Sequence, residues 1–512
     1  MAMRNSRTDS VALRVALLFL GACVLLRFAG WWTQGVASAW PRFEDDAYYY
    51  LVIARNAASG HGFSADGLSP TNGFQPLWMW LLVPVAWLTS GDTAWLLAAT
   101  QLVVVGVFAA SGGLLCDLLH RRFGFLPALV GGAVFLVPRF SNVLLSGMES
   151  GIAVLLLVLL VRERVGPARA TRTGVLLGLL MLARLDSVFV GVTLAGYLAV
   201  EGMARGGSPL GRRALGTVRA GLATFWPTVA LVTPYLAWNY FAFGHLVPIS
   251  GVLKTSHSEL GWMPENLNPT YLSLLVLSAV AVAALFRRGG DSRFAGTLAA
   301  LVAGIGLQAL HALVFMRWAV FSWHYALFIP IGAIGSAALA REAEQRLPRS
   351  ATRLAVAALA ALLVVTQAAS VRRLPLGFTG AAREAGEWAA RSLPEGAVLG
   401  MKDSGAFSYF AGHRVMNLDG VVNSFEFSET LCRGELGEFL RAHGVEYVAQ
   451  HAVPPDVRAG TYERFTQIYS CHFPGGRDST LVFRRDHEVY RGSPYTNYQG
   501  RRDELVIWRV GG

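Results

Sequence analysis

Charged residues are scarce in this chain. Only 15% of its 512 residues are Asp, Glu, Lys or Arg, whereas 54% are hydrophobic. Soluble domains carry about 25% charged residues, so the composition does not fit an ordinary soluble protein. The sequence also has no continuous basic stripe and no nucleic-acid motif. The net charge of +11 therefore does not indicate DNA or RNA binding.

Other signals are missing as well. The sequence has no G-x-G-x-x-G string, which argues against nucleotide binding. It has no visible internal repeat, which argues mildly against many transporter folds. Cysteine is limited to four residues, of which Cys432 and Cys471 lie in the C-terminal tail. These two can pair if the tail lies in an oxidising compartment, and the sequence leaves their pairing open.

Apolar runs of about twenty residues recur from residue 11 to about residue 370, and each is long enough to cross a bilayer. Basic residues lie in short loops between the runs, which is the positive-inside pattern. The sequence therefore predicts a mostly α-helical, polytopic membrane protein with about eleven transmembrane helices. The expected spans are 11–32, 93–118, 124–140, 146–163, 173–184, 187–202, 221–241, 268–287, 294–315, 318–340 and 352–371.

The basic N-terminus favours an uncleaved first helix that begins in the cytoplasm. If 76–90 also crossed the membrane, the basic cluster at 120–122 would lie outside, against the charge rule. We therefore predict that 76–90 is a juxtamembrane or half-inserted helix on the outer face, within a first outer loop at about 33–92. The remaining spans then place the C-terminus outside.

The chain is predicted to divide into a membrane module at 1–374 and a soluble tail at 375–512, where the polarity becomes ordinary. The strings AVLGM, RVMNL and VEYVAQ are typical of short buried strands, and AAREAGEWAARSL is typical of an amphipathic helix. Helical stretches are expected between the strands at about 404–411 and 424–443. This alternation predicts a small extracytoplasmic α/β domain.

Three consecutive acids, Glu44, Asp45 and Asp46, follow the first apolar run directly. Carboxylates beside a bilayer are costly unless they face water or have a task. We expect Asp45 or Asp46 to cap a helix that runs from Ala47 to about Ser59. A cap followed by a solvated acidic loop is the plainer interpretation, and a functional site is the alternative.

The strings EDDAYYYLVIARN, GHGF and PTNGFQPLW resemble the first outer loop of the GT-C superfamily, above all its arabinofuranosyltransferase-like group. Protein O-mannosyltransferases and the aminoarabinose transferases of lipid A are more distant relatives. The resemblance implies a glycosyltransferase of the bacterial cytoplasmic membrane that uses a polyprenyl-phosphate-linked sugar donor. The acceptor would be an envelope glycan, glycolipid or protein. The catalytic acid of the family's first loop falls on Asp45 and Asp46, with Glu44 a weaker third.

Such chemistry needs acids of this kind. A carboxylate takes the proton of the acceptor hydroxyl, and a single displacement with one base inverts the anomeric centre. The departing phosphate gains charge that cations or a metal stabilise. Asp45 and Asp46 together are alternatively ligands for a divalent cation, Mg or Mn, because hard cations prefer carboxylate oxygens. The metal-assisted and metal-free variants both remain open.

Residues for binding the donor phosphate or the substrate come from later outer loops and from the first loop itself. Lys254, in PISGVLK, resembles the family's P-x-S-x-x-x-K pattern, and the string G-M-E places Glu149 in a pattern typical of these proteins. The full set of candidates is Lys254, Arg184, Arg317, His324, Glu149, Tyr49 and Gln75.

Each candidate also has a plainer interpretation. Lys254 is alternatively a surface lysine whose amine extends to water, and Arg184 an ion-pair partner of Asp186. The histidine is alternatively packed among interfacial aromatics, and Glu149 is alternatively a helix cap. The tail string NLDGVVNS resembles a motif of related enzymes, with a simple strand-to-helix turn as the alternative.

Two other classes of protein compete with the enzyme. A transporter or lipid flippase would have polar residues lining a path through the membrane, whereas the ionisable residues here gather at one face. A non-catalytic partner in envelope assembly would leave the acids without a chemical role.

Overall fold

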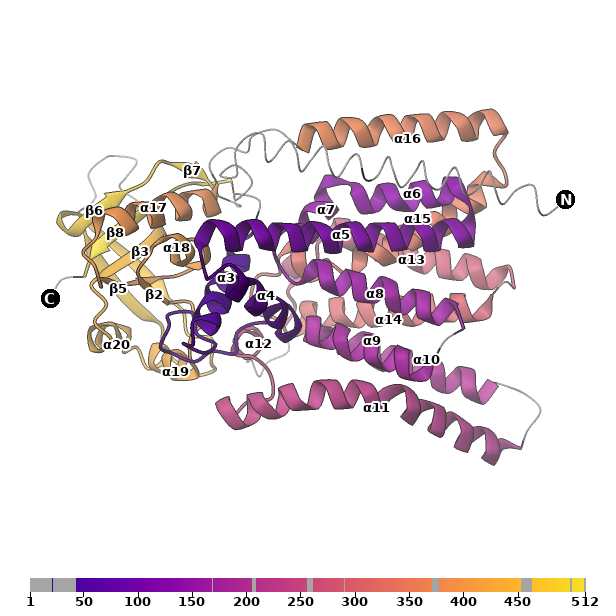
Figure 1. Ribbon diagram of the computed structural model, residues 1–512, viewed down its shortest axis with the longest axis horizontal. Helices are drawn as coiled ribbons and strands as arrows, with labels where there is room; N and C mark the ends of the chain where they lie inside the picture. The colour runs from indigo at the N-terminus through magenta and orange to yellow at the C-terminus, as the bar shows by residue number, and fades with distance from the viewer. Residues whose placement is uncertain are drawn as a thin grey trace. The chain divides into compact units, whose positions relative to one another are not determined.

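The computed structural model describes Gly21 and residues 43–167, 169–204, 209–255, 261–289, 291–370, 377–452, 463–497 and 500–510 (Figure 1). The chain forms two compact units. The first consists of Met1–Gly35, Val103–Tyr235 and Gly261–Arg372. The second consists of Val36–Leu102, Leu236–Leu260 and Arg373–Gly512. The first loop and the segment 236–260 therefore share a unit with the tail, although they are far from it in sequence.

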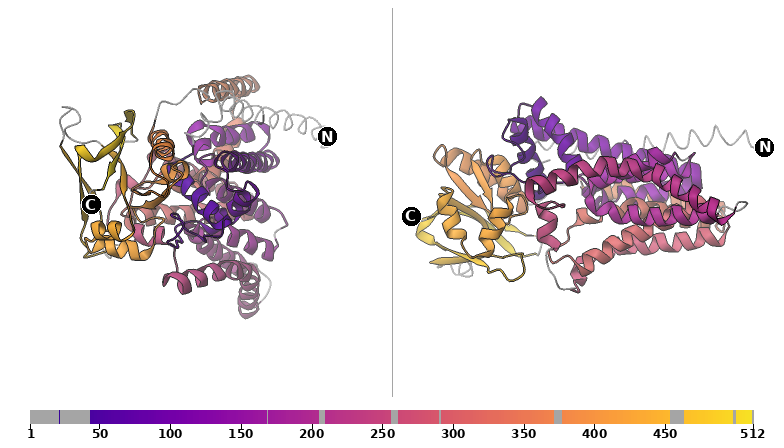
Figure 2. Two further views of the ribbon diagram at one scale, coloured as in Figure 1. Left: turned by 60° about the vertical axis from the view of Figure 1, so that its left-hand side comes forward. Right: turned by 90° about the horizontal axis from the view of Figure 1, so that it is seen from below.

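The first unit is helical, and its helices lie side by side (Figures 1 and 2). Glycines on α15 allow α13 to approach closely, because a Cβ at Gly332 or Gly335 would press against Leu274 or Ser278 of α13. The elements are most of α5 (Thr93–Phe123) and α11 (Leu210–Phe243), with α6 (Phe125–Leu136), α7 (Pro138–Leu144), α8 (Ser150–Val165), α9 (Ala170–Ala183), η2 (Leu185–Ser187), α10 (Val188–Ala204), η3 (Pro264–Asn266), α13 (Pro269–Arg287), α14 (Ser292–Val314), η4 (Ser322–Tyr325), α15 (Phe328–Glu344) and α16 (Arg349–Ser370).

Five described helices are long and apolar enough to cross a bilayer, which makes the chain a multi-pass helical membrane protein, as predicted. They are Thr93–Phe123, Leu185–Ala204, Leu210–Phe243, Pro269–Arg287 and Ser292–Val314. Two other expected spans, 146–163 and 173–184, correspond to the shorter helices α8, with 16 residues, and α9, with 14. The span expected at 352–371 corresponds to α16. Apart from Gly21, the expected span 11–32 lies outside the described residues.

Two expected spans differ from the structure in a way that sterics explain. The span expected at 124–140 is bent by 66° between α6 and α7, because Pro138 begins a new helix and cannot continue the old one. The span expected at 318–340 begins only at Phe328. The short turn η4 precedes it, and there the Phe321 N–H donates to Nδ1 of His324 at 3.2 Å.

The second unit contains a sheet with strand order β2-β1-β3-β8-β6. Strand β1 is parallel to β2 and β3, whereas β8 is antiparallel to β3 and β6. The strands are β1 (Val398–Met401), β2 (Arg414–Asn417), β3 (Tyr447–Ala452), β6 (Glu488–Arg491), β7 (Tyr495–Thr496) and β8 (Arg502–Arg509), with a separate hairpin of β4 (Arg464–Tyr469) and β5 (Ser479–Arg484).

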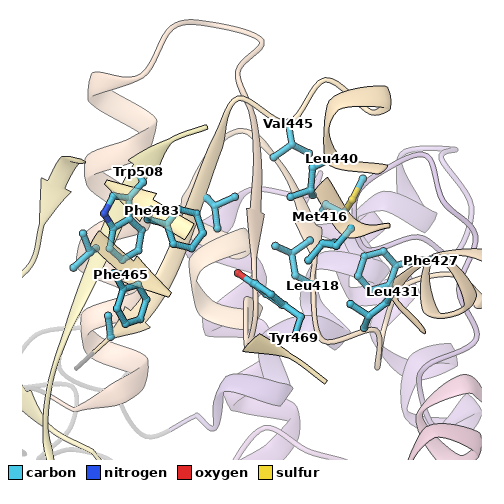
Figure 3. Close-up of a cluster of buried hydrophobic side chains, with 14 residues drawn as sticks. Met416, Leu418, Phe427, Leu431, Leu440, Val445, Phe465, Tyr469, Phe483 and Trp508 are labelled. Atoms are coloured by element: carbon cyan, nitrogen blue, oxygen red, sulfur yellow. The ribbon is translucent and has the colours of Figure 1, made fainter. Parts of the chain in front are cut away.

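The predicted α/β tail is confirmed. Helix α17 (Phe378–Ser392) precedes its three strands, and α18 (Gly405–Phe410), α19 (Phe425–Cys432) and α20 (Leu436–Ala442) lie between them in the chain. Helix α17 buries Ala381, Ala385 and Ala389 on one face, at the four-residue spacing that the pattern predicts. In the core, Met416, Leu418 and Phe427 form one group, and Phe465 and Phe483 of the hairpin stack on Trp508 of β8 in another (Figure 3). Cys432 and Cys471 form a disulfide, which settles the pairing that the sequence left open.

Three helices outside the tail complete the second unit: α3 (Asp45–Ala58), α4 (Pro76–Leu88) and α12 (Ile249–Thr255). Helix α4 has 13 residues, which span about 20 Å and fall short of a bilayer core of about 30 Å. The expected capping of α3 by Asp45 or Asp46 is wrong. Glu44 occupies the N-cap, and no side chain makes a cap hydrogen bond there.

Candidate functional site

The Asp45 carboxylate is directed at the start of α18 and not at its own helix. Its Oδ2 accepts the N–H of Gly405 at 2.9 Å, and its Oδ1 accepts the N–H of Ala406 at 2.8 Å. The first N–H groups of a helix have no partner within the helix, so a carboxylate there satisfies them and interacts favourably with the helix dipole. Gly405 is required sterically, because an added Cβ would overlap the backbone carbonyl of Asp45.

Tyr49, one turn further along α3, is buried and joins the same part of the tail. Its hydroxyl donates to Oδ2 of Asp419 at 3.3 Å. It accepts from Nδ2 of Asn417 at 3.0 Å and from the Ser404 N–H at 2.8 Å. All the hydrogen-bonding capacity of this hydroxyl is used within the protein. The tyrosine therefore fixes α3 against the tail, and sugar binding by its hydroxyl would require these bonds to break.

Several acids share this region, and their charges affect one another. Burial raises the pKa of Glu44 to about 7, and the negative charge of Asp46 adds to the effect. Burial also raises the pKa of Asp45 well above its usual value, although the backbone hydrogen bond from Ala406 opposes the shift. In the tail, burial and the charge of Asp419 raise the pKa of Asp403. Glu44 and Asp403, whose pKa values rise to about 7, can therefore hold and exchange protons near neutral pH.

The tail string NLDGVVNS forms a turn, and it also contacts the first loop and α12. Gly420 has a φ of 87°, which favours glycine. The Thr71 hydroxyl donates to the backbone carbonyl of Asn423 at 3.1 Å, and a Cβ at Gly73 would overlap the Val421 carbonyl. On the other side, Leu253 of α12 lies against Gly420. The turn interpretation is right, but it omits that this segment touches both the acidic helix and the helix that carries Lys254.

Lys254 itself is half-buried in the last turn of α12. Gln75 stands at the N-cap of α4, where its backbone N–H donates to the Tyr50 hydroxyl at 3.1 Å. The second unit thus contains Asp45, Asp46, Tyr49, Gln75 and Lys254 among the predicted site residues.

The other predicted residues belong to the first unit. Arg184 is 4% exposed and donates to Glu149 at 2.8 Å and to Asp186 at 2.7 Å. The ion pair offered as the alternative for Arg184 is present, and Glu149 extends it instead of capping α8. The guanidinium is thus neutralised by two carboxylates.

Arg317 and His324 lie nearby in sequence and also belong to the first unit. The Arg317 guanidinium lies against Gly261, and His324 closes the η4 turn through its Nδ1. The His324 ring also stacks on Trp323, with centroids 5.8 Å apart, as the interfacial-packing alternative expected.

The tail acids Asp403 and Asp419 and the amide of Asn417 were not predicted as site residues. Only NLDGVVNS carried a signal for the last two. Asp403 is in the left-handed region, with a φ of 52°, and its N–H donates to Asp419 at 2.9 Å. No sequence pattern marks it. Over the described residues, no group of three or more His, Cys, Asp or Glu side chains is arranged to hold a metal ion.

Comparisons with known proteins give a consistent fold. Residues 370–490 match a domain of unknown function, DUF8728. No curated protein sequence matches the chain. Among solved structures, the oligosaccharyltransferase AglB of Archaeoglobus fulgidus, in complex with an inhibitory peptide and a dolichol-phosphate, is 14% identical. Its TM-score is 0.55, and the match covers 94% of this chain and 75% of that one.

A second neighbour is ArnT of Cupriavidus metallidurans bound to undecaprenyl phosphate, which is 15% identical with a TM-score of 0.53. That match covers 95% of this chain and 97% of ArnT. The Archaeoglobus fulgidus oligosaccharyltransferase in complex with Zn and sulfate is 13% identical, with a TM-score of 0.51, and the match covers 92% of this chain and 73% of that one. Both enzymes are GT-C glycosyltransferases, and the fold of this chain is the GT-C fold, as its first loop predicted.

Proposed function

We propose that this protein is a membrane glycosyltransferase that moves a sugar from a polyprenyl-phosphate-linked donor to a cell-envelope acceptor. The observation that carries the proposal is the acidic start of α3, buried against the tail in a chain with the GT-C fold. The neighbours were solved with undecaprenyl phosphate and with dolichol-phosphate and a peptide. A lipid-linked donor and an envelope glycan, glycolipid or protein acceptor follow from that likeness.

Asp46 is the stronger candidate for the base. Both oxygens of Asp45 accept backbone N–H groups, which suits a residue that positions the tail. Asp46 is its immediate neighbour and is half-buried. In the proposed step, Asp46 takes the proton of the acceptor hydroxyl as its oxygen bonds to the anomeric carbon. The bond from that carbon to the phosphate oxygen breaks, the lipid phosphate leaves with the electron pair, and the anomeric configuration inverts.

Lys254 is assigned to the donor phosphate, because it stands on α12 in the same unit as Asp46 and its ammonium is a suitable point charge. A divalent cation, Mg or Mn, would supply further charge stabilisation if Asp46 helped to hold it. That variant needs ligands beyond Asp45, whose two oxygens are already hydrogen-bonded. Arg184, Arg317 and His324 are further candidates for binding the substrate.

We propose that the tail lies outside the bacterial cytoplasmic membrane and the N-terminus in the cytoplasm. The disulfide between Cys432 and Cys471 supports this placement, because such bonds persist in oxidising compartments.

The direct test uses membranes that contain Asp46→Asn or Asp45→Asn variants at parental levels, a radiolabelled polyprenyl-phospho-sugar and a crude acceptor. Loss of a general base typically costs about 10²–10⁴-fold in rate, so Asp46→Asn should fall in that range. Asp45→Glu serves as the control for Asp45, because it keeps the charge. Transfer at the parental rate by Asp46→Asn would show that the base is elsewhere. Testing several donor sugars with the parent protein would identify the substrate.

A further inference from the structure

Two fully buried amides connect the first loop to the segment that carries Lys254. Asn72, in the string PTNG, accepts the Ile249 N–H on its Oδ1 at 2.9 Å and donates through Nδ2 to Oδ1 of Asn239 at 3.1 Å. Asn239, near the end of α11, donates in turn to the Leu246 carbonyl at 3.1 Å. Both asparagines are 0% exposed.

This amide pair, Asn72 and Asn239, is hydrogen-bonded to the backbone at the beginning of α12. Ile249 is the first residue of α12, and Leu246 lies three residues before it. A helix of seven residues has few hydrogen bonds of its own and depends on tertiary contacts for its position. The two asparagines satisfy backbone groups on both sides of the turn into α12, so the first loop determines where this short helix lies.

Aromatic contacts connect the same segments. The Phe74 ring, two residues after Asn72, lies 6.4 Å from that of Trp238, which precedes Asn239. Trp238 contacts Phe243 at 5.3 Å between centroids, and Phe243 lies 6.4 Å from Phe425 of the tail. The amide pair itself is fully buried, which makes its hydrogen bonds costly to lose.

We infer that Asn72 and Asn239 are positioning residues that hold α12, and with it Lys254, in place for the donor phosphate. This inference rests on the proposed function, in which Lys254 binds that phosphate. Lysine has a long, flexible side chain, so the placement of its backbone decides which point its ammonium reaches. A displacement of about 1 Å is enough to change a rate by about 100-fold. In the motif P-T-N-G, proline and glycine are common in turns, whereas Asn72 has the additional role of positioning α12.

The test measures binding of undecaprenyl phosphate to the purified full-length protein in detergent, independently of sugar transfer. The variants are Lys254→Gln, Asn72→Ala, Asn239→Ala and the double variant Asn72→Ala/Lys254→Gln. We expect Lys254→Gln to weaken binding by about tenfold or more, since hydrogen bonds to charged groups contribute at least that much. Each asparagine variant should weaken it by about tenfold, and the double variant should bind no more than twofold more weakly than Lys254→Gln alone.

Asn56→Ala is the matched control. Asn56 also belongs to the second unit, and its Nδ2 donates within the first loop, to the Ser64 carbonyl at 2.8 Å. Its affinity for undecaprenyl phosphate should stay within twofold of the parent. Asn239→Ala keeps the test decisive if Asn72→Ala does not fold, because it leaves the bond from the Ile249 N–H to Asn72 in place and removes the bonds of Asn239 to Asn72 and to the Leu246 carbonyl.

The outcomes separate the two claims. Unchanged binding by Lys254→Gln would remove the phosphate role of Lys254 and with it the proposed assignment of that residue. Weakened binding by Lys254→Gln, with parental binding by both asparagine variants, would overturn the inference alone. A lowered melting temperature with parental affinity would show a purely structural pair, and additive losses in the double variant would show that Asn72 acts without Lys254. Either result also overturns the inference.

Discussion

The hydrogen bonds from Asp45 to the start of α18 predict a large and local effect of Asp45→Asn. The amide keeps one acceptor oxygen, so one of the two N–H groups of Gly405 and Ala406 retains its partner. The other backbone N–H group then faces the NH₂ of the asparagine, so it is buried without a hydrogen-bond acceptor. Losing one charge-assisted bond costs about 1.5–3 kcal/mol, and the unsatisfied donor adds about 1–3 kcal/mol.

Taking a conservative total of about 3 kcal/mol, local opening of α18 becomes about 150-fold more frequent. Hydrogen exchange followed by mass spectrometry on a peptide that covers 404–411 measures this directly. The amides of that peptide should exchange about 100-fold faster in Asp45→Asn than in the parent. Peptides from the far side of the sheet, such as β8, should exchange at parental rates.

Asp291→Asn is the matched control for this experiment. Asp291 also accepts two backbone N–H groups at a helix start, those of Arg293 at 3.0 Å and Phe294 at 3.1 Å. Asp291 belongs to the first unit, so its substitution changes a carboxylate to an amide at the start of α14 and should leave α18 unaffected. Parental exchange of the α18 peptide in Asp45→Asn would refute the claim that Asp45 holds this helix.

Three further outcomes are expected. Because burial raises the pKa of Glu44 to about 7 from 4.5, the native state binds more protons than the unfolded state between these values. Stability therefore falls by up to about 3 kcal/mol as pH rises from about 4.5 to 7; thermal melts of Glu44→Gln should show a weaker fall, and an identical pH dependence would contradict the assignment. Gly405→Ala should speed exchange of the α18 peptide as Asp45→Asn does, because its Cβ overlaps the Asp45 carbonyl; parental exchange would show that the backbone gives way freely. Cys432 and Cys471 should react with maleimide only after reduction, and labelling without reductant would show free thiols. Because the two cysteines are 39 residues apart, reduction should lower the free energy of unfolding of the tail by about 4 kcal/mol, measured by protease resistance.

Patterns along the chain were enough to predict the class of fold. Apolar runs and scarce charge indicated a multi-pass helical protein, since a bilayer requires long apolar helices. The strings AVLGM, RVMNL and VEYVAQ correctly indicated β1, β2 and β3, because short apolar runs between turn signals are typical of buried strands. The first-loop strings correctly indicated the GT-C fold. The hairpin β4–β5 and the strands β6 to β8 were not predicted.

The candidate site depends on contacts that no local pattern contains. Asp45 meets Gly405 across 360 positions, and Tyr49 meets Asp419 across 370. From sequence alone, Asp45 was expected to cap its own helix, because a cap is the nearest use for an acid at a helix start. The tertiary structure instead gives it the N–H groups of a different helix.

For the acids of Glu44–Asp46, the sequence by itself determined their identity and the family whose loop they resemble. Only the tertiary structure decided which acid is engaged by the tail, which shifts in pKa follow from burial, and that Asn72 reaches α12. The physical reason is that hydrogen bonds and desolvation depend on which groups meet in space, and chain distance carries almost no information about that meeting.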